Sequence, residues 1–262
     1  MKITVIGGTG LIGSRLTRAL QDAGHDVLVG ARATGVNSYT GEGLEVALTG
    51  ADVLIDVSNS SYTDEAAARD FFYTSTMNLL SYGRAVGVPH HVALSVVGTD
   101  RLARAEGGYF AAKEQQERLI VESKQPYSLV HATQFFEFIR SITDDATHAG
   151  KVRVADVLLQ PMAAADVAGA VAEIALGSPL FGMVEFAGPE VFSLEQLASQ
   201  DLRFRHDERE VVADPLGRYF GARLQARDLL PEATATLAPT RYHDWRIHSG
   251  VASEAAAVSG TE

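Results

Sequence analysis

A glycine-rich turn near the start of the chain constrains the fold more than any other feature of the sequence. Residues 7–13 read GGTGLIG, directly after the β-branched run 2–6 and at the start of a helical periodicity over 11–23. Glycine permits positive φ and a close approach of the backbone to a ligand, while free amides at a helix N-terminus attract an anion. This context of strand, turn and helix favours a phosphate-binding turn over a tight turn that binds nothing.

The same alternation of strand and helix continues through the first half of the chain. Apolar runs predict strands over 2–6, 26–29, 53–57, 91–95 and 127–131, with helices over 11–23, 64–86 and 109–123 between them. Strands that alternate with helices form a parallel sheet, and right-handed crossovers bring the carboxyl ends of the strands to one edge. We therefore predict an α/β fold, a Rossmann-type doubly wound parallel sheet whose ligands bind at that edge.

The pattern loosens after about residue 150. Short strands are expected over 151–154 and 183–186, and helices over 166–176 and 194–200. We expect one domain over 1–250, with a core over about 1–150 and a small C-terminal α/β lobe over about 151–250 that covers the substrate. Residues 251–262 consist mainly of Ala, Ser, Gly and Glu without an apolar face, which predicts a disordered tail.

Composition argues against several classes of function. The chain has no cysteine, which excludes disulfides, thiolate metal sites and a cysteine nucleophile. A net charge of −11 disfavours nucleic acid as a partner. The sequence has no apolar run of about 18 residues and enters a strand at once, so we expect no membrane span, no signal segment and a cytoplasmic location. For His90 and His91 a surface turn is a better interpretation than a metal pair, because neighbouring strand residues face opposite ways. No metal site is predicted.

The end of the second predicted strand bears on the choice of nicotinamide cofactor. An acidic residue there accepts from a ribose 2′-hydroxyl, whereas an arginine receives a 2′-phosphate. This strand ends at Arg32 and carries no carboxylate at its tip. The guanidinium favours NADP(H), with NAD(H) still open, since Arg32 could instead be solvated or stack on an adenine.

A tyrosine and a lysine stand one helical turn apart after the fourth predicted strand. Tyr109 and Lys113 are spaced i and i+4, so both side chains project from one face of the helix. A nearby cation lowers the pKa of a phenol and makes it a better proton donor to a carbonyl. Ser95 closes the preceding strand and would face the same edge of the sheet. The alternatives are a spacing that arises by chance and a serine that only caps a strand end.

With these residues in place, the chain resembles the short-chain dehydrogenase/reductase superfamily, and within it the atypical extended, NmrA-like branch. The likeness covers roughly residues 1–189. It is carried by residues 7–13, 32, 51–53, 57–59, 94–95, 109 with 113, 132–136, 160–162, 166–167 and 187–190. The resemblance implies a cofactor site built from Gly7, Thr9, Gly10, Leu11, Ile12 and Gly13 at the pyrophosphate, Asp52 and Val53 at the adenine, Val57 and Ser58 at the ribose, and Thr133, Gln134 and Phe135 at the nicotinamide. Lys113 is a further candidate for cofactor binding, because its ammonium can hold the nicotinamide ribose.

The same resemblance implies two candidate functions. The first is an NAD(P)H-dependent oxidoreductase that reduces a small carbonyl or quinone-type substrate, with Tyr109 and Lys113 as the proton donor pair and Ser95 assisting. The second is a non-catalytic, NADP(H)-sensing regulatory protein that binds a partner. Two departures favour the second: Val96 and Val97 stand where catalytic members carry their serine, and Phe71 and Phe72 stand near an expected asparagine, with Asn78 a turn too late. The substrate is not specified, and a homodimer is compatible with the sequence.

Overall fold

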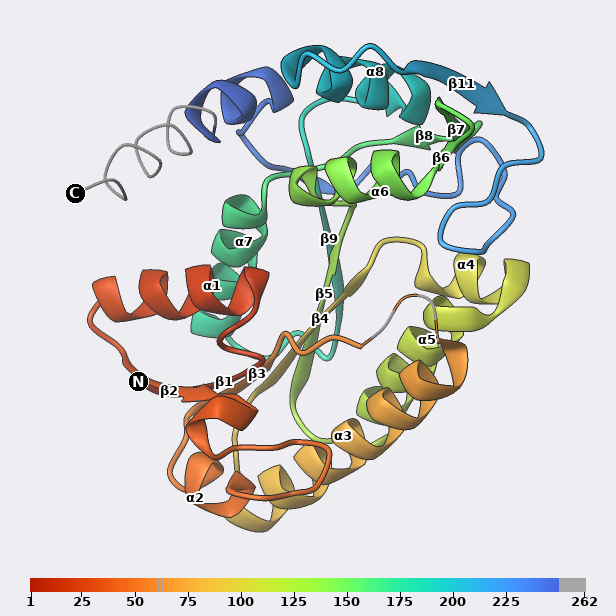
Figure 1. The fold of residues 1–262 in the computed structure, drawn as a ribbon. Helices are drawn as coiled ribbons and strands as arrows, with labels where there is room; N and C mark the ends of the chain where they lie inside the picture. The colour runs from red at the N-terminus through yellow and green to blue at the C-terminus, as the bar shows by residue number, and fades with distance from the viewer. Residues whose placement is uncertain (61, 63, 250–262) are drawn as a thin grey trace.

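A seven-stranded sheet, in which every neighbouring pair is parallel, forms the centre of the molecule (Figure 1). The computed structural model describes residues 1–60, 62 and 64–249. The strand order is β12-β9-β5-β4-β3-β1-β2. The strands are β1 (Lys2–Ile6), β2 (Asp26–Gly30), β3 (Val53–Asp56), β4 (His91–Val96), β5 (Tyr127–Ala132), β9 (Gly182–Ala187) and β12 (Thr236–Leu237). The predicted fold class is confirmed.

Helices cover both faces of this sheet. On one face α1 (Leu11–Asp22) packs against α7 (Ala164–Leu176), and on the other α3 (Glu65–Val86) packs against α5 (Gly108–Glu122) (Figure 1). The carboxylate of Asp64 caps α3 by accepting from the Ala67 amide, and Gly87 ends it in the left-handed conformation. Because both faces are covered, β3 and β5 are buried along their whole length.

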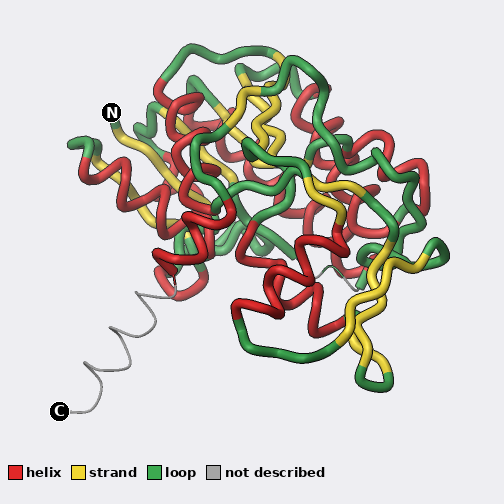
Figure 2. The backbone as a smooth tube through the Cα atoms, turned by 90° about the horizontal axis from the view of Figure 1, so that it is seen from above, coloured by secondary structure: helices red, strands yellow, loops and turns green. Residues whose placement is uncertain are grey.

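The chain leaves this sheet after β5 and again after β9 to form a smaller lobe. The lobe contains α6 (Ile139–Asp145), β6 (Thr147–His148), β7 (Lys151–Ala155), β8 (Leu158–Leu159), β10 (Phe192–Ser193), α8 (Leu194–Phe204) and β11 (Glu210–Asp214). Its three-stranded sheet has the order β11-β7-β6, and its strands lie apart from the N-terminal strand of the main sheet in the view from above (Figure 2). The predicted division near residue 150 is too simple. Helix α7 and strands β9 and β12 return to the main sheet, where β9 pairs with β5 and its Phe186 and Ala187 side chains are buried.

Several local predictions need correction. His90 and His91 do not lie in a surface turn: both are buried, and the Nε2 atom of His90 lies 2.8 Å from the Ser128 hydroxyl. Four short helical elements were not predicted, because they are too short to show a clear hydrophobic period: α2 (Leu44–Leu48), α4 (Thr99–Glu106), η1 (Arg32–Thr34) and η2 (Phe136–Phe138). The predicted tail, 251–262, lies outside the described residues. In the described part of the chain, no helix combines the length and apolarity needed to cross a bilayer.

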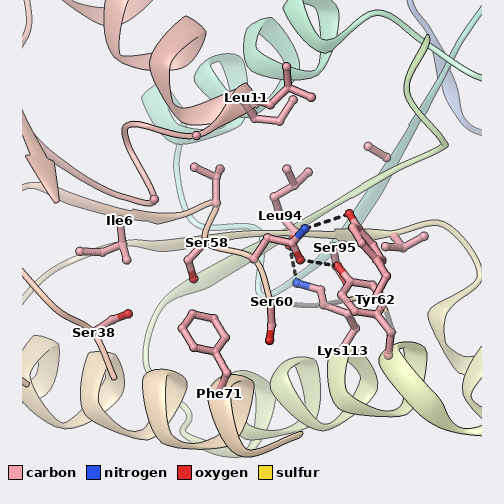
Figure 3. Close-up of a pocket in the computed structure, with 18 of the residues that line it drawn as sticks. Ile6, Leu11, Ser38, Ser58, Ser60, Tyr62, Phe71, Leu94, Ser95 and Lys113 are labelled. Carbon is pink, nitrogen blue, oxygen red and sulfur yellow. Dashed lines mark hydrogen bonds between the residues drawn. The ribbon is translucent and has the colours of Figure 1, made fainter. Parts of the chain in front are cut away.

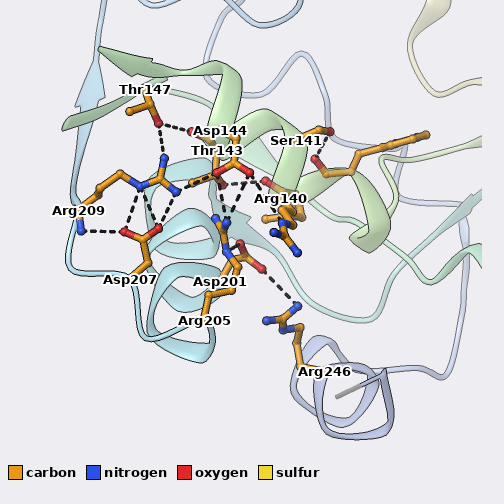
Figure 4. A network of polar contacts seen from close by, with 12 residues as sticks. Arg140, Ser141, Thr143, Asp144, Thr147, Asp201, Arg205, Asp207, Arg209 and Arg246 are labelled. Atoms are coloured by element: carbon orange, nitrogen blue, oxygen red, sulfur yellow. Dashed lines mark hydrogen bonds and ion pairs between the residues drawn. The ribbon is translucent and has the colours of Figure 1, made fainter. Parts of the chain in front are cut away.

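A network of charged side chains, here called the polar anchor, holds the lobe together (Figure 4). Its members are Asp144, Asp201, Arg205, Asp207, Arg209 and Arg246. The carboxylate of Asp201 is almost fully buried and lies 2.8 Å from the Arg205 Nε atom and 3.4 Å from the Arg246 Nη1 atom. The polar anchor therefore joins α6 and α8 to the helical segment 242–249.

Candidate functional site

The glycine turn between β1 and α1 is closed by backbone contacts that leave no room for side chains. Gly7 has a φ of +80°, and its amide donates to the Gly30 carbonyl over 2.9 Å. A Cβ atom on Gly7 would lie 2.8 Å from the backbone of Ser58, and one on Gly13 would lie 2.1 Å from the Gly7 carbonyl oxygen. Only glycine fits at these two positions, because the turn is pressed against both its own helix and the end of β3.

One continuous cavity of about 930 Å³ runs along the carboxyl edge of the sheet from this turn to α5 (Figure 3). The predicted site residues that line it are Gly7, Thr9, Gly10, Leu11, Ile12, Arg32, Val57, Ser58, Ser95, Tyr109, Lys113, Thr133, Gln134 and Phe135. Gly13 lies behind the turn, and Phe136, next to Phe135, is a core residue that packs on Tyr242. The carboxyl ends of β1, β3, β4 and β5 meet at one edge, which is why residues far apart in sequence share a single cavity.

Asp52 and Val53 do not belong to this cavity. They lie at the amino end of β3, where the Asp52 carboxylate accepts from the Lys2 amide over 2.8 Å. The amino ends of parallel strands lie at the opposite edge of a sheet, so the predicted contact of these two residues with an adenine is wrong.

The loop after β2 supplies the far end of the cavity instead. Its lining includes Asn37, Ser38 and Tyr39. The Asn78 amide donates to the carbonyls of Ser38 and Tyr39, each over 2.9 Å, and so fixes this loop. Asn78 therefore has a structural contact here rather than a place in a proton relay.

Arg32 stands at the rim of the same end of the cavity. It begins η1 directly after β2, and its side chain is exposed. Within the described part of the chain, its guanidinium has no ion-pair partner. The position leaves this charge available to a ligand, as the sequence predicted for a 2′-phosphate.

Two phenols and an asparagine meet at the other end of the cavity (Figure 3). The Tyr109 hydroxyl donates to Asn59 Oδ1 over 2.8 Å, and Asn59 Nδ2 donates to the Tyr62 hydroxyl over 2.8 Å. The rings of Tyr62 and Tyr109 have centroids 4.5 Å apart. The sequence reasoning assigned no role to Asn59 or Tyr62. Asn59 could have been found from its place just after β3, at the carboxyl edge.

The pKa of Tyr109 differs in direction from the prediction. Burial raises the pKa of this phenol well above its ordinary value of 10, and the neighbouring Tyr62 phenol adds to the rise. The expected lowering by Lys113 is wrong because the ammonium is bound elsewhere: its Nζ atom donates to the Leu94 carbonyl over 2.8 Å and to the Gln116 side chain. Tyr109 is therefore held as a neutral phenol.

Lys113 is a buried cation at the centre of a polar chain. Burial lowers the pKa of its ammonium to about 8, although the carboxylates of Asp56 and Glu117 act in the opposite direction. The Gln116 amide donates in turn to Asp56 over 2.9 Å, and the Ser58 hydroxyl donates to the same carboxylate over 2.6 Å. These contacts connect the end of β3 at the cavity wall to the middle of α5.

Ser95 is also bound to a buried carboxylate. Its hydroxyl donates to Glu117, whose Oε1 atom lies 3.1 Å from the Nε2 atom of His131. Burial alone would raise the pKa of Glu117, but its contacts with His131, Ser95 and Lys113 lower it below the ordinary value. Ser95 lines the cavity as predicted, but its proton is committed to Glu117 rather than directed at a ligand.

The residues around the cavity fit a dinucleotide. No side chain caps α1 at Gly10, and the first turn of this helix has no acidic residue, so the helix N-terminus is free to face an anion. At the far side of the cavity, the Oε1 atom of Gln134 is buried without a hydrogen-bond partner among the described residues. A buried unpaired acceptor is costly, and a ligand with an N–H or O–H donor would satisfy it.

Comparison with known proteins is consistent with this geometry. Residues 3–78 match the model of the NAD dependent epimerase/dehydratase family. Over 151 residues the chain is 24% identical to the photosystem II assembly factor Ycf39 of Synechocystis sp., a match that covers 52% of this chain and 46% of the relative. The matched region thus spans about half the length of the curated relatives.

Two solved structures share the whole fold. A short-chain dehydrogenase/reductase superfamily protein from Agrobacterium tumefaciens with bound NAD has a TM-score of 0.74 at 15% identity, with 99% of each chain covered. The NADPH-dependent quinone oxidoreductase QOR2 of Escherichia coli, complexed with NADPH, has a TM-score of 0.68 at 18% identity, over 94% of this chain and 99% of the other. The chain therefore shares the Rossmann-type fold of these two solved structures, and its residues 3–78 match the model of the NAD dependent epimerase/dehydratase family.

Proposed function

We propose that the protein is an NADPH-dependent oxidoreductase that reduces a small carbonyl or quinone-type acceptor. One observation carries the proposal: a single cavity joins the glycine turn to the buried phenol of Tyr109 and the ammonium of Lys113. A dinucleotide anchored at the turn and extended along this cavity would end beside Tyr109. The Escherichia coli protein that shares this fold is an NADPH-dependent quinone oxidoreductase, which supports the choice of acceptor class.

The chain's own residues then have distinct tasks. A bound reduced nicotinamide would supply the hydride. Tyr109, kept neutral by its raised pKa, would turn the proton that it gives to the neutral Asn59 Oδ1 in this structure towards the alkoxide or phenolate oxygen that develops on the acceptor. Asn59 positions this phenol through their shared hydrogen bond. Lys113, held between Leu94 and Gln116, places a positive charge near the site, where it stabilises developing negative charge.

Arg32 supports a preference for NADP(H) over NAD(H). It is an exposed cation at the rim of the cavity, at the tip of β2, where no carboxylate competes with a 2′-phosphate.

The test begins with calorimetric titration of the protein with NADPH and NADH. Aldehydes and quinones are then added while the absorbance of the reduced cofactor is followed. We expect saturable NADPH binding, and a loss of turnover in Tyr109→Phe of about 10²- to 10⁴-fold with binding retained. Tyr73→Phe is the matched control, because Tyr73 is an exposed phenol on α3 that does not line the cavity. Equal turnover in the two variants would contradict the assignment of Tyr109.

The hydrogen bond of Ser95 favours a second candidate function, that of a regulatory protein that binds the cofactor without turnover. The Ser95 proton is held by Glu117, so this serine does not present a donor to a substrate carbonyl. The curated relatives are named as assembly factors, which supports a protein that binds the cofactor and a partner without turnover. Tight NADPH binding with no oxidation across the panel would favour this second function.

A further inference from the structure

A second cavity lies directly behind the proposed proton donor. This distal cavity has a volume of about 890 Å³ and lies between α5, the end of α6, β7 and the loop after β11. It shares five wall residues with the first cavity, here called the aromatic partition: Tyr62, Tyr109, Phe110, Tyr219 and Phe220. The two cavities therefore meet at the phenol that the proposed function uses.

Phe220 stands in this partition at the tip of a tight hairpin. Tyr219 and Ala222 exchange backbone hydrogen bonds of 2.9 and 3.0 Å, and the two residues between them have φ values of +48° and +86°. A turn with two positive φ values suits Asn-Gly or Gly-Gly, whereas an aromatic residue there is strained. The ring of Phe220 stacks on Tyr62 with centroids 5.0 Å apart. The strained position thus places a large ring in the wall between the cavities.

The far walls of the distal cavity are polar. Asp145, His148 and Arg153 line it with exposed charged or titratable side chains, and Glu65 lines it from the start of α3. A group bound there would meet both donors and acceptors, beyond an aromatic wall that suits a planar ring.

We propose that the distal cavity holds the part of the acceptor that lies beyond its reducible group, and that Phe220 determines how large an acceptor can reach Tyr109. The inference rests on the proposed function. A dinucleotide anchored at the glycine turn would extend along the first cavity towards Tyr109, so the acceptor would have to reach its nicotinamide from the Tyr109 end, where the aromatic partition stands. The substrate class is a planar carbonyl or quinone ring with a polar extension that passes the aromatic partition.

The kinetic test compares a small and a large acceptor in two phenylalanine variants. The probes are 1,4-benzoquinone and a naphthoquinone that carries a polar side chain. In Phe220→Ala we expect kcat/KM for the large probe to rise roughly tenfold relative to the small one. Phe181→Ala is the matched control, because Phe181 has a φ of +50°, is 61% exposed and lines neither cavity. An unchanged ratio in Phe220→Ala would overturn the assignment of Phe220.

A second test measures occupancy without turnover. Because the chain has no cysteine, a single introduced thiol reports one place. Ala146→Cys lies in the distal cavity, and Val46→Cys, at a position that is 78% exposed and outside both cavities, is the control. With NADP⁺ and the large quinone present, we expect iodoacetamide to alkylate Cys at 146 several-fold more slowly and Cys at 46 at an unchanged rate. Equal protection at the two positions, or no protection at either of them, would overturn the proposal.

The two tests separate the inference from the function on which it rests. A protein that protects the thiol at 146 but turns over neither quinone would retain the distal cavity as a binding site and lose the oxidoreductase assignment. A protein that reduces both quinones without protection at 146 would retain that assignment and lose the distal site.

Discussion

The glycine turn and the polar anchor are both closely packed, but they are held by different physics. In the turn, backbone contacts backbone, and an added Cβ atom on Gly13 would lie 2.1 Å from a carbonyl oxygen. In the anchor, long charged side chains from three segments converge on Asp144 and Asp201. The first region depends on the absence of side chains and the second on their charge. The steric requirement of the turn can therefore be predicted from a local sequence motif, whereas the long-range ion pairs of the polar anchor cannot.

The sharpest test of this contrast is a single methyl group in the turn. Gly13→Ala should destabilise the fold by about 4 kcal/mol or more, because rigid backbone atoms cannot move away from the new Cβ. Urea unfolding gives the value. Gly169→Ala, at an exposed position inside α7 with nothing within 4 Å of the new Cβ, should instead stabilise by about 0.5 to 1 kcal/mol. An unchanged or increased stability in Gly13→Ala would mean that the new Cβ is accommodated and that steric contact does not govern the turn.

The corresponding test of the polar anchor removes one charge and keeps the apolar stem. Arg205→Met should cost about 3 kcal/mol, because the buried Asp201 carboxylate would retain only its longer contact with Arg246. Arg104→Met removes an exposed ion pair with Asp100 and should cost less than about 1 kcal/mol. The comparison fails if denaturant midpoints shift equally in the two variants.

Lys113 tests whether a buried charge in the wall of the first cavity behaves like a buried charge in the polar anchor. Its folded pKa of about 8 lies below the ordinary value of 10.5, so burying the charged form is unfavourable. This penalty is fully present below pH 8 and is relieved as pH rises towards 10.5, because the unfolded chain then binds the extra proton. Between pH 7.5 and 10 the wild type should gain about 2 kcal/mol relative to Lys113→Met. Parallel stability curves for the two proteins would show that the site offsets the burial of this charge completely.

The smallest expected effect concerns Arg32, the exposed cation at the rim of the first cavity. Arg32→Ala should weaken NADPH binding about tenfold in calorimetry, because an exposed guanidinium contributes at the low end for a charged hydrogen bond. The affinity for NADH should change little. Equal losses for both nucleotides would indicate stacking on the adenine rather than a contact with a 2′-phosphate.

The parts of the site that the sequence predicts are those set by local geometry. The glycine turn, the strand ends and the spacing of Tyr109 and Lys113 follow from period and residue type, and the structure places all of them on one cavity. The adenine contact of Asp52 and Val53 was implied by the family resemblance alone, whereas the direction of the chain places these residues at the amino end of β3, away from the cavity. The prediction that Lys113 lowers the pKa of Tyr109 was also wrong. The spacing places the two residues on one helix face but does not reveal that Leu94 and Gln116 bind the ammonium.

Other features have no local signal at all. Tyr62 contacts Asn59 and Tyr109 only because the segment after β3 lies beside α5 in the folded chain. The hairpin at Phe220 gives no sequence signal, because its Phe-Gly pair is not a sequence that favours a turn with two positive φ values. The polar anchor pairs residues of three segments that lie far apart along the chain. Such contacts depend on the tertiary structure and cannot be predicted from the hydrophobic period of the sequence.

The strand order of the main sheet also governs the sequence of events in folding. Strands β2, β1, β3, β4 and β5 all come from residues 2–132 and are adjacent in the sheet, whereas β9 joins β5 only after the chain has passed through the lobe. Closing that long loop costs conformational entropy before the pairing of β5 with β9 compensates for it. We therefore expect pulsed hydrogen exchange during refolding to protect the amides of β4 before those of β9, so that the cofactor turn is built on a sheet that is still growing at its other edge.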